Sequence, residues 1–301
     1  MRNASEGPER AIARNAESPY RIGMDFSIRH FAEVGSTMET AKGLIGGGLP
    51  SPAIILADRQ LSGRGRIEGR RWEGAPGASL LMTLCLKGDA ASRPAPPLRV
   101  GLGVVDVLAR FAGPAFRIKW PNDIMGLRGG GLANGAANGG APNGEANGAP
   151  KDRKPASWGK LGGLLCEIYG EWFLAGIGLN LRPAAYPPDL AAAAASVAEA
   201  AIAYRAGAAA LSWLEDAEAL AAAIGEAVAR RLGDDAWRDG YERLLWARGE
   251  EVNFVAGHPE RGEIRRGRIR GVDEAGRLVL ATSGGEEEAF WSGEISSVRA
   301  V

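Results

Sequence analysis

The sequence predicts an α+β domain followed by a small all-β domain. Between residues 26 and 248, segments with apolar residues at helical spacing alternate with short apolar runs typical of buried strands. Residues 249–301 instead contain short predicted strands at roughly ten-residue spacing, separated by Gly-containing turns, which indicates a small barrel or sandwich. The chain has 301 residues, 46% of them apolar and 24% charged, a composition typical of globular proteins.

The first domain is predicted over residues 23–248, after a polar tail of residues 1–22. Ser36 and Thr37 precede a short helix and are suited to cap it. Apolar runs predict strands over residues 53–57, 78–87, 116–120, 158–170 and 171–181. Helical spacing predicts helices over residues 98–113, 208–232 and 236–249, with one more early in residues 189–233.

A low-complexity tract interrupts this pattern. In residues 129–150, 20 of 22 residues are Gly, Ala, Asn or Pro, and such a tract cannot bury enough apolar surface to offset the entropy lost on ordering. We interpret residues 129–157 as a flexible insertion. Deleting residues 130–150 is expected to leave activity nearly intact, because closure entropy grows only slowly with loop length.

Charge and composition exclude several classes of protein. Lys plus Arg and Asp plus Glu both number 36, so the formal net charge is zero, which argues against a general nucleic-acid binder. Cys85, Cys166 and two histidines are too few for a disulfide framework or a structural zinc site. No run reaches the roughly 18 apolar residues of a membrane span, and the N-terminal segment lacks a signal-peptide core. We therefore expect a soluble, cytoplasmic protein.

Two basic motifs point to an anionic ligand. Gly63-Arg64-Gly65-Arg66 alternates glycines, which let a backbone approach a ligand closely, with arginines, whose planar donors bind phosphate or carboxylate. A solvated turn or a nonspecific RNA contact is the alternative for this loop. Lys160 enters an otherwise apolar strand, either to reach water at a sheet edge or to point at an anion.

Polar and small residues mark two further strands. KWPND at residues 119–123 places an amide and a carboxylate directly after a strand, where loops commonly carry function. These groups suit Mg²⁺, a ribose hydroxyl or an amine, although Pro-Asn-Asp is also ordinary turn chemistry. The small residues of GIGLN at residues 176–180 indicate close approach of a ligand or of another backbone.

Together, in this order, these segments resemble the biotin–protein ligase family. The resemblance rests on Ser36-Thr37, GRGR at residues 63–66, KWPND at 119–123, GKLGG at 159–163 and GIGLN at 176–180, followed by a small β domain. It covers roughly nine tenths of the chain, from about Phe31 to the C-terminus. It implies a mixed sheet with helices, related to class II aminoacyl-tRNA synthetases, and a C-terminal SH3-like β-barrel, in a ligase-only form without an N-terminal DNA-binding domain.

The resemblance implies an ATP-dependent biotin–[acetyl-CoA-carboxylase] ligase. Such enzymes activate biotin with MgATP to biotinyl-5′-AMP, then transfer the biotin to a lysine of a biotin carboxyl carrier domain in acetyl-CoA carboxylase or a related carboxylase. Mg²⁺ is expected to accompany ATP, with no metal ion held directly by protein side chains. No nucleic acid and no membrane is expected as a partner, and a homodimer is among the oligomeric states left open.

The resemblance also assigns roles to individual residues. Biotin contacts are expected from Ser36, Thr37, Gln60, Arg64, Gly65, Arg66, Lys160 and Gly176. Nucleotide contacts are expected from Arg64, Arg66, Trp120, Asn122, Lys160 and Asn180. Lys160 and Arg64 are expected to act in catalysis by offsetting the repulsion between the reacting carboxylate and phosphate. Asp123 is expected to orient the acceptor lysine and help remove its proton.

The chain departs from the family pattern in three places. Met38 stands where Asn usually follows Ser-Thr, residues 66–72 form a basic loop one residue longer than usual that contains Glu68, and the insertion separates KWPND from GKLGG. Two other functions therefore stay open. One is a lipoate or octanoate ligase or transferase of the same superfamily, which GRGR together with KWPND disfavours. The other is a biotin-binding sensor without transfer activity.

Overall fold

The computed structural model describes residues 23–66, 72, 77–128, 157–183, 190, 192–204, 208–258, 260–282 and 284–298. The predicted tail of residues 1–22 and all but the last residue of the predicted insertion 129–157 lie outside the described residues.

A mixed seven-stranded sheet forms the centre of the larger part of the molecule, with strand order β1-β2-β3-β7-β6-β5-β4. Its strands are β1 (Ser27–Val34), β2 (Ala53–Gln60), β3 (Ser79–Lys87), β4 (Phe116–Lys119), β5 (Asp123–Arg128), β6 (Ser157–Tyr169) and β7 (Trp172–Asn180). The β1–β2 pair is parallel and the other five pairs are antiparallel. The predicted α+β class with a mixed sheet is confirmed.

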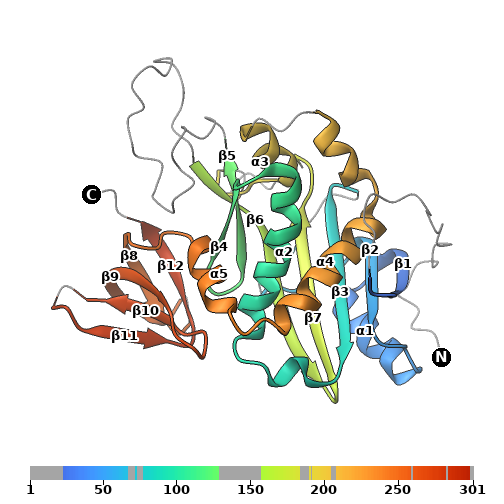
Figure 1. The fold of residues 1–301 in the computed structure, drawn as a ribbon, viewed down its shortest axis with the longest axis horizontal. Coiled ribbons are helices and arrows are strands. Elements are labelled where there is room, and N and C mark those ends of the chain that lie inside the picture. The colour runs from blue at the N-terminus through green and yellow to red at the C-terminus, as the bar shows by residue number, and fades with distance from the viewer. Residues whose placement is uncertain are drawn as a thin grey trace.

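Helices cover both faces of this sheet. The helices are α1 (Thr37–Gly46), α2 (Pro96–Ala112), α3 (Val197–Ala203), α4 (Ala217–Leu232) and α5 (Trp237–Leu244), with 3-10 turns η1 (Asp89–Ser92) and η3 (Ala208–Glu215). Figure 1 shows α2 and α4 crossing the same face of the sheet. In β2, Ile54 and Leu56 belong to the core cluster that contains α2 and α4, whereas Ile55 and Ala57 pack in the cluster that contains α1. Because β2 is buried on both faces, its sequence is a continuous apolar run.

Two predicted helices have other bounds in the structure, and two strands, β1 and β5, were not predicted. The helix predicted over residues 208–232 is divided into η3 and α4, because Asp216 caps a new helix by accepting a hydrogen bond from the Ala219 N–H. The helix predicted over residues 236–249 ends at Leu244, since Leu245 is extended and bridges to Ile118 of β4. Strand β5 was not predicted, because it begins immediately after the turn that ends β4.

The C-terminal strands form a second sheet, beside β4 and α5 in Figure 1. Its order is β11-β10-β9-β8-β12, and all pairs are antiparallel. The strands are β8 (Glu251–Ala256), β9 (Glu263–Val272), β10 (Leu278–Ala281), β11 (Glu287–Phe290) and β12 (Gly293–Val298).

This sheet curls without closing into the expected barrel. The ring centroids of Phe254 on β8 and Phe290 on β11 lie 4.8 Å apart, across the concave side. Among the described residues no pairing joins β11 to β12, so the sheet is open between these two strands. Residues 291–292 separate the two strands in the sequence.

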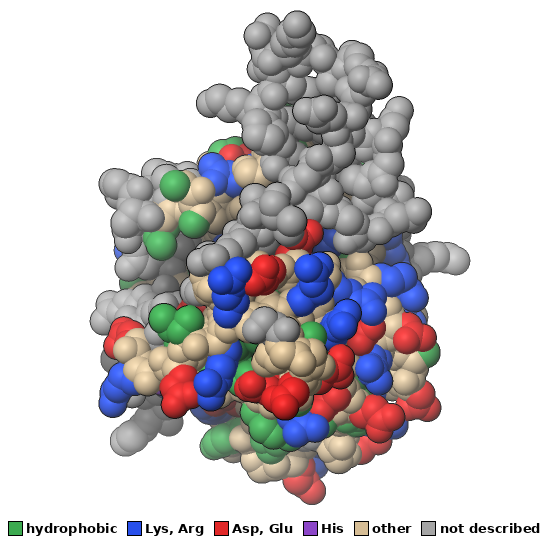
Figure 2. All heavy atoms as spheres, turned by 90° about the vertical axis from the view of Figure 1, so that its left-hand side faces the viewer, with side chains coloured by type: hydrophobic (Ala, Val, Ile, Leu, Met, Phe, Trp, Pro, Cys, Tyr) green, Lys and Arg blue, Asp and Glu red, His purple; other side chains and the backbone are tan. Residues whose placement is uncertain are grey.

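The outer surface at this end of the molecule carries mixed charge. Figure 2 shows Lys and Arg interspersed with Asp and Glu on this side of the molecule. Arg265 of β9 lies 2.6 Å from Glu263 and 3.7 Å from Glu288, and Arg270 lies 3.7 Å from Glu287. The arginine-rich strand and the glutamate-rich strand therefore neutralise each other across the sheet.

Candidate active site

A pocket partly open to solvent lies on the face of the large sheet that carries α1. Its floor is glycine-rich: Gly163 of β6 and Gly178 of β7 are register partners, and Gly176 follows the same face of β7. A Cβ at Gly178 would lie 2.7 Å from Cε2 of Trp72, and one at Gly163 would lie 3.3 Å from its Cζ3. Glycine is thus required where the Trp72 indole packs onto the strands.

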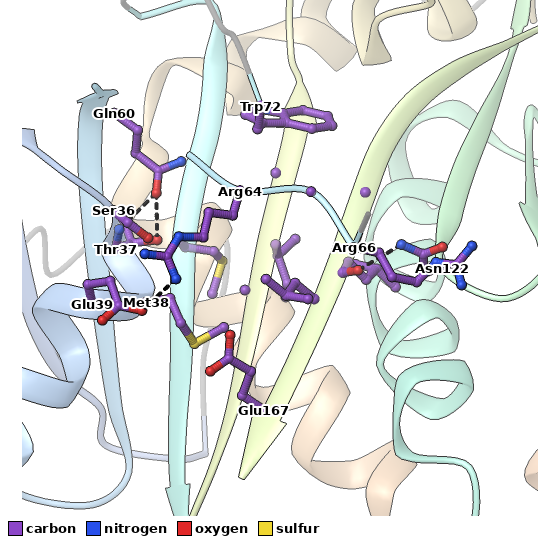
Figure 3. Close-up of a pocket in the computed structure, with 18 of the residues that line it drawn as sticks. Ser36, Thr37, Met38, Glu39, Gln60, Arg64, Arg66, Trp72, Asn122 and Glu167 are labelled. Atoms are coloured by element: carbon purple, nitrogen blue, oxygen red, sulfur yellow. Dashed lines mark hydrogen bonds and ion pairs between the residues drawn. The ribbon is translucent and has the colours of Figure 1, made fainter. Parts of the chain in front are cut away.

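The structure brings most of the residues predicted from sequence to this one pocket (Figure 3). They come from the start of α1, the loop after β2, the β4–β5 turn and the two glycine-rich strands. The pocket-lining residues among them are Ser36, Thr37, Gln60, Arg64, Gly65, Arg66, Asn122, Lys160 and Gly176.

A chain of hydrogen bonds fixes the uncharged polar end of the pocket. Oε1 of Gln60 accepts hydrogen bonds from the Thr37 backbone N–H at 2.8 Å and from Thr37 Oγ1 at 3.1 Å. Thr83 Oγ1 donates to Thr37 Oγ1 at 2.9 Å. With its carbonyl oxygen engaged, Gln60 can offer a ligand only its Nε2 donor.

Ser36 does not act as predicted at the start of α1. It occupies the N-cap position with extended backbone angles, but its side chain makes no capping hydrogen bond. Ser36 instead lines the pocket, so the residue that was expected to cap the helix contributes a hydroxyl group to the site.

Lys160 and Asp123 form an ion pair at the opposite end of the site. Lys160 Nζ lies 2.7 Å from Asp123 Oδ1, and the lysine side chain is 45% exposed. The Lys160 backbone makes two hydrogen bonds to the segment that precedes α3. Its N–H donates to Ala193 O at 2.6 Å, and its carbonyl oxygen accepts from Ala195 N–H at 2.8 Å. The strand therefore fixes where this ammonium group is delivered. Asp123 reaches the site through this pair rather than by lining the pocket itself.

The two arginines of the GRGR loop have different partners. Arg64 Nη1 donates to Glu39 Oε1 at 3.4 Å, at the edge of the pocket (Figure 3). Arg66 Nη2 donates to the carbonyl oxygen of Gly293, at the start of β12, at 3.1 Å. Arg66 and Asn122 lie together on the side of the pocket away from Gln60 (Figure 3). This side therefore carries the donors suited to an anion.

Sequence reasoning missed two charged residues and one aromatic residue of the pocket, Glu39, Glu167 and Trp72, besides apolar wall residues such as Met82. Lys42 joins the two carboxylates, with Nζ 2.7 Å from Glu167 Oε2 and 3.0 Å from Glu39 Oε1. The hydrogen bond with Glu167 is the main cause that raises the pKa of Lys42, and Glu39 adds to it against the effect of burial. The spacing of Glu39 and Lys42 on one helix face was a local signal for half of this network. No short-range sequence pattern links Glu39 or Lys42 to Glu167, and none indicates that Trp72 lines the pocket.

Met38, the main departure from the family pattern at the start of α1, lies inside the pocket wall. It is buried, and a Cβ at Gly176 would lie 3.0 Å from its Cε. The thioether thus occupies space beside the glycine floor where a polar amide was expected from the family pattern.

The structure does not bring Trp120 and Asn180 to the pocket. Trp120 is 2% exposed, donates from Nε1 to Gly276 O at 3.0 Å and packs against Phe254. The ring of Trp120 and its only donor are thus used between the two sheets and not in the pocket. Asn180 is 9% exposed, and its Nδ2 donates to Ala195 O at 3.2 Å.

Neither a metal-binding cluster nor a membrane-spanning helix is present among the described residues. Within them, no three His, Cys, Asp or Glu side chains cluster in a way that suits a metal ion. No helix in this part of the chain combines the length and the apolar character needed to cross a membrane.

Comparison with known proteins gives two family matches. Residues 31–135 match the model of the biotin/lipoate A/B protein ligase family, and residues 249–297 match that of the biotin protein ligase C-terminal domain. Together these matches cover just over half of the chain.

The curated relatives are bacterial proteins named bifunctional ligase/repressor BirA. The Bacillus subtilis protein is 32% identical over 117 residues, 36% of each chain, and the Escherichia coli protein is 34% identical over 80 residues, 26% of this chain and 25% of that relative. The matched segments thus span about a third or less of these relatives.

Solved structures share the fold over most of the chain. A biotin protein ligase from Aquifex aeolicus, in complex with biotin and ATP, superposes with a TM-score of 0.66 at 22% identity, covering 91% of this chain and 99% of that one. A biotin protein ligase from Leishmania major, in complex with biotinyl-5-AMP, gives a TM-score of 0.52 at 18% identity, covering 88% and 98%. The two family matches place this chain in the biotin protein ligase family.

Proposed function

We propose that this chain is an ATP-dependent biotin–protein ligase, which makes biotinyl-5′-AMP and transfers the biotin to a lysine of a biotin carboxyl carrier domain. One observation carries the proposal. In one pocket, hydroxyl and amide groups surround Gln60, and Arg66 and Asn122 lie on the side away from it. Lys160 and a floor of glycines line the same pocket. A neutral ring system with an acidic chain fits this polarity.

The uncharged end suits the ureido group of biotin. That group has two N–H donors and one carbonyl acceptor, and the hydroxyls of Ser36 and Thr37 can accept or donate as needed. Nε2 of Gln60 is the remaining donor of its amide, because Oε1 is engaged by Thr37. The bare backbone at Gly176 and Gly178 lets Met38 and Trp72 pack against the strands, and these two side chains form apolar walls suited to a ring system.

The charged end suits adenylation. A carboxylate oxygen of biotin attacks the α-phosphorus of ATP, a new O–P bond forms, and the bond to the bridging oxygen of the β-phosphate breaks with release of pyrophosphate. Two anions must approach each other in this step, so donors fixed in place before the reaction stabilise the transition state. Lys160, Arg64 and Arg66 are the cations that line the pocket. Mg²⁺ is proposed to enter bound to the phosphates of ATP.

The same end suits transfer to an amine. The acceptor lysine nitrogen attacks the acyl carbon of biotinyl-5′-AMP, an amide bond forms, and AMP leaves with the electrons of the C–O bond. The attacking amine must be neutral and must lose a second proton during the step. Asp123, 2.7 Å from Lys160, is proposed to orient this amine and accept its proton.

The partner and the compartment follow from the proposed activity. The acceptor is proposed to be the carrier domain of acetyl-CoA carboxylase or a related carboxylase. The need for ATP and the two free thiols Cys85 and Cys166 suit the cytoplasm, where thiols are kept reduced.

The test is biotin transfer to a purified carrier domain, with the acceptor lysine replaced by arginine as the control. The proposal requires ATP-dependent biotin incorporation that the control carrier does not show. Lipoate is added in competition. If lipoate or octanoate is incorporated in place of biotin, the chain belongs instead to the other branch of its superfamily. If neither is incorporated while biotin still binds, a sensor function replaces the ligase.

A further inference from the structure

The second sheet touches the GRGR loop of the pocket directly. Arg66 follows β2 in the large domain, yet its Nη2 donates to the carbonyl oxygen of Gly293, the first residue of β12, at 3.1 Å. The two residues are 227 positions apart in the chain. This contact thus links one of the pocket arginines to a fixed point of the C-terminal sheet.

The Gly293 backbone is held in a conformation that only glycine adopts without strain. Its φ is +154°, and a Cβ at this position would lie 2.2 Å from Cζ of Phe254 and 2.5 Å from the carbonyl oxygen of Val255. Phe254 is fully buried and packs against Phe290. The packing of these rings therefore determines the position of the carbonyl group that Arg66 contacts.

The same aromatic cluster also contacts a second wall of the pocket. The rings of Phe254 and Trp120 have centroids 6.0 Å apart, and Nε1 of Trp120 donates to Gly276 O at 3.0 Å. Trp120 immediately precedes the turn that carries Asn122, which lines the pocket and donates from Nδ2 to Leu164 O at 3.0 Å. One rigid cluster in the C-terminal sheet thus lies behind both Arg66 and Asn122, on the same side of the pocket.

We propose that Gly293 is a positioning residue for the reaction. Its carbonyl oxygen holds Arg66 over the anion-binding side of the pocket, and the C-terminal sheet thereby sets the geometry of adenylation without touching the substrate. The proposal rests on the proposed ligase function. It requires that disturbing Gly293 lower the rate of adenylation while the contacts at Ser36, Thr37 and Gln60, which lie on other elements, keep the affinity for biotin.

The first experiment compares Gly293→Ala with Gly285→Ala in the full-length chain. Gly285 is a matched control: it also has positive φ, +84°, and lies in the connection between β10 and β11 of the same domain, but a Cβ there meets no atom within 4 Å. In biotin-dependent ATP–pyrophosphate exchange, Gly293→Ala is expected to lower kcat by about tenfold, the effect of losing one charge-assisted hydrogen bond, with KM for biotin within about twofold of wild type. Gly285→Ala is expected to change kcat by less than about twofold.

A double-mutant cycle separates positioning from a general loss of structure. In the background of Arg66→Met, Gly293→Ala is expected to change kcat by less than about twofold, because the contact it acts through is already absent. Equal tenfold effects in both backgrounds would overturn the proposal. If Gly293→Ala fails to fold, Phe254→Leu replaces it, since this change alters the ring that fixes Gly293 and leaves the glycine in place.

A measurement that needs no catalysis completes the test. Hydrogen exchange of the backbone amides at residues 61–66 is expected to be faster in Gly293→Ala than in Gly285→Ala. Equal exchange in the two variants would overturn the positioning role even if the wild type is fully active. If the wild type shows no pyrophosphate exchange, the proposed function fails, and the hydrogen exchange result still decides whether Gly293 holds the loop.

Discussion

Substituting Gly178 by alanine tests the shape of the pocket. The new Cβ would lie 2.7 Å from Cε2 of Trp72 and 3.0 Å from its Nε1. Carbon atoms pack at about 3.5–4.0 Å, so the indole must move by about 1 Å to accept the methyl group. Overpacking of this kind costs about 1–3 kcal/mol. Trp72 is half-buried and lines the pocket, so we expect this cost in ligand binding more than in folding.

The expected result is a Kd for biotin raised by about 5- to 150-fold, with a melting temperature within about 2 °C of wild type. Isothermal titration calorimetry and a thermal melt measure the two quantities. Gly163→Ala is the graded control, because its Cβ would lie 3.3 Å from Cζ3 of Trp72 and needs a shift of only a few tenths of an ångström. Its effect on Kd is expected to be smaller. A Kd unchanged in Gly178→Ala would refute Trp72 as a wall of the biotin site.

Three further outcomes are expected. Lys160→Met should lower the rate of pyrophosphate exchange by about 100-fold, while the Kd for biotin, measured by calorimetry, changes by less than about tenfold. If the rate and the affinity fall by the same factor, Lys160 binds biotin and the transition state equally and has no specific role in catalysis. Burial acts to raise the pKa of Asp273, but hydrogen bonds from Arg277 outweigh it and the pKa is lowered. The stabilisation is therefore present above the unfolded-state pKa and is lost as the pH falls through the folded-state value, so Asp273→Asn should melt below wild type at neutral pH, with the difference closing below about pH 3. A constant difference across the pH range would contradict this sign. Burial raises the pKa of the Cys85 thiol to about 12, so Ellman's reagent at about pH 8 should not label it before unfolding; labelling of the native protein would contradict its burial.

The elements that depend on local patterns were the most predictable. Strand β3 is buried along most of its length, and α2 ends at Ala112 with Gly113 as its C-cap, beside the predicted end at residue 113. The break between η3 and α4 has a local cause, the N-cap Asp216, but the surrounding Ala-rich sequence favours one continuous helix. Arg99 of α2 shows a different limit. It is 2% exposed because its guanidinium bonds four backbone carbonyls, three of them at or beyond the end of α4, and no local pattern reports such a partner.

The site residues that could be predicted lie in motifs whose residue types by themselves indicate a chemical role. GRGR, KWPND and Lys160 could be found from residue types alone, although their convergence depends on strand register, such as the pairing of Gly163 with Gly178. Trp72 could not be found in this way, because its position follows from the bare glycine floor across the sheet. The surroundings of Trp120 could not be predicted for a related reason. The sequence cannot show that the C-terminal sheet covers its ring and accepts its N–H.

Biotin-dependent ATP–pyrophosphate exchange in the purified wild-type chain with Mg²⁺ tests the central claim most directly. It reports formation of the adenylate alone and needs no acceptor protein. The account predicts exchange that requires biotin, that lipoate does not support and that Lys160→Met loses. Absence of biotin-dependent exchange in a folded protein that still binds biotin would contradict the claim, and Met38 in the pocket wall would be the first residue to replace with asparagine.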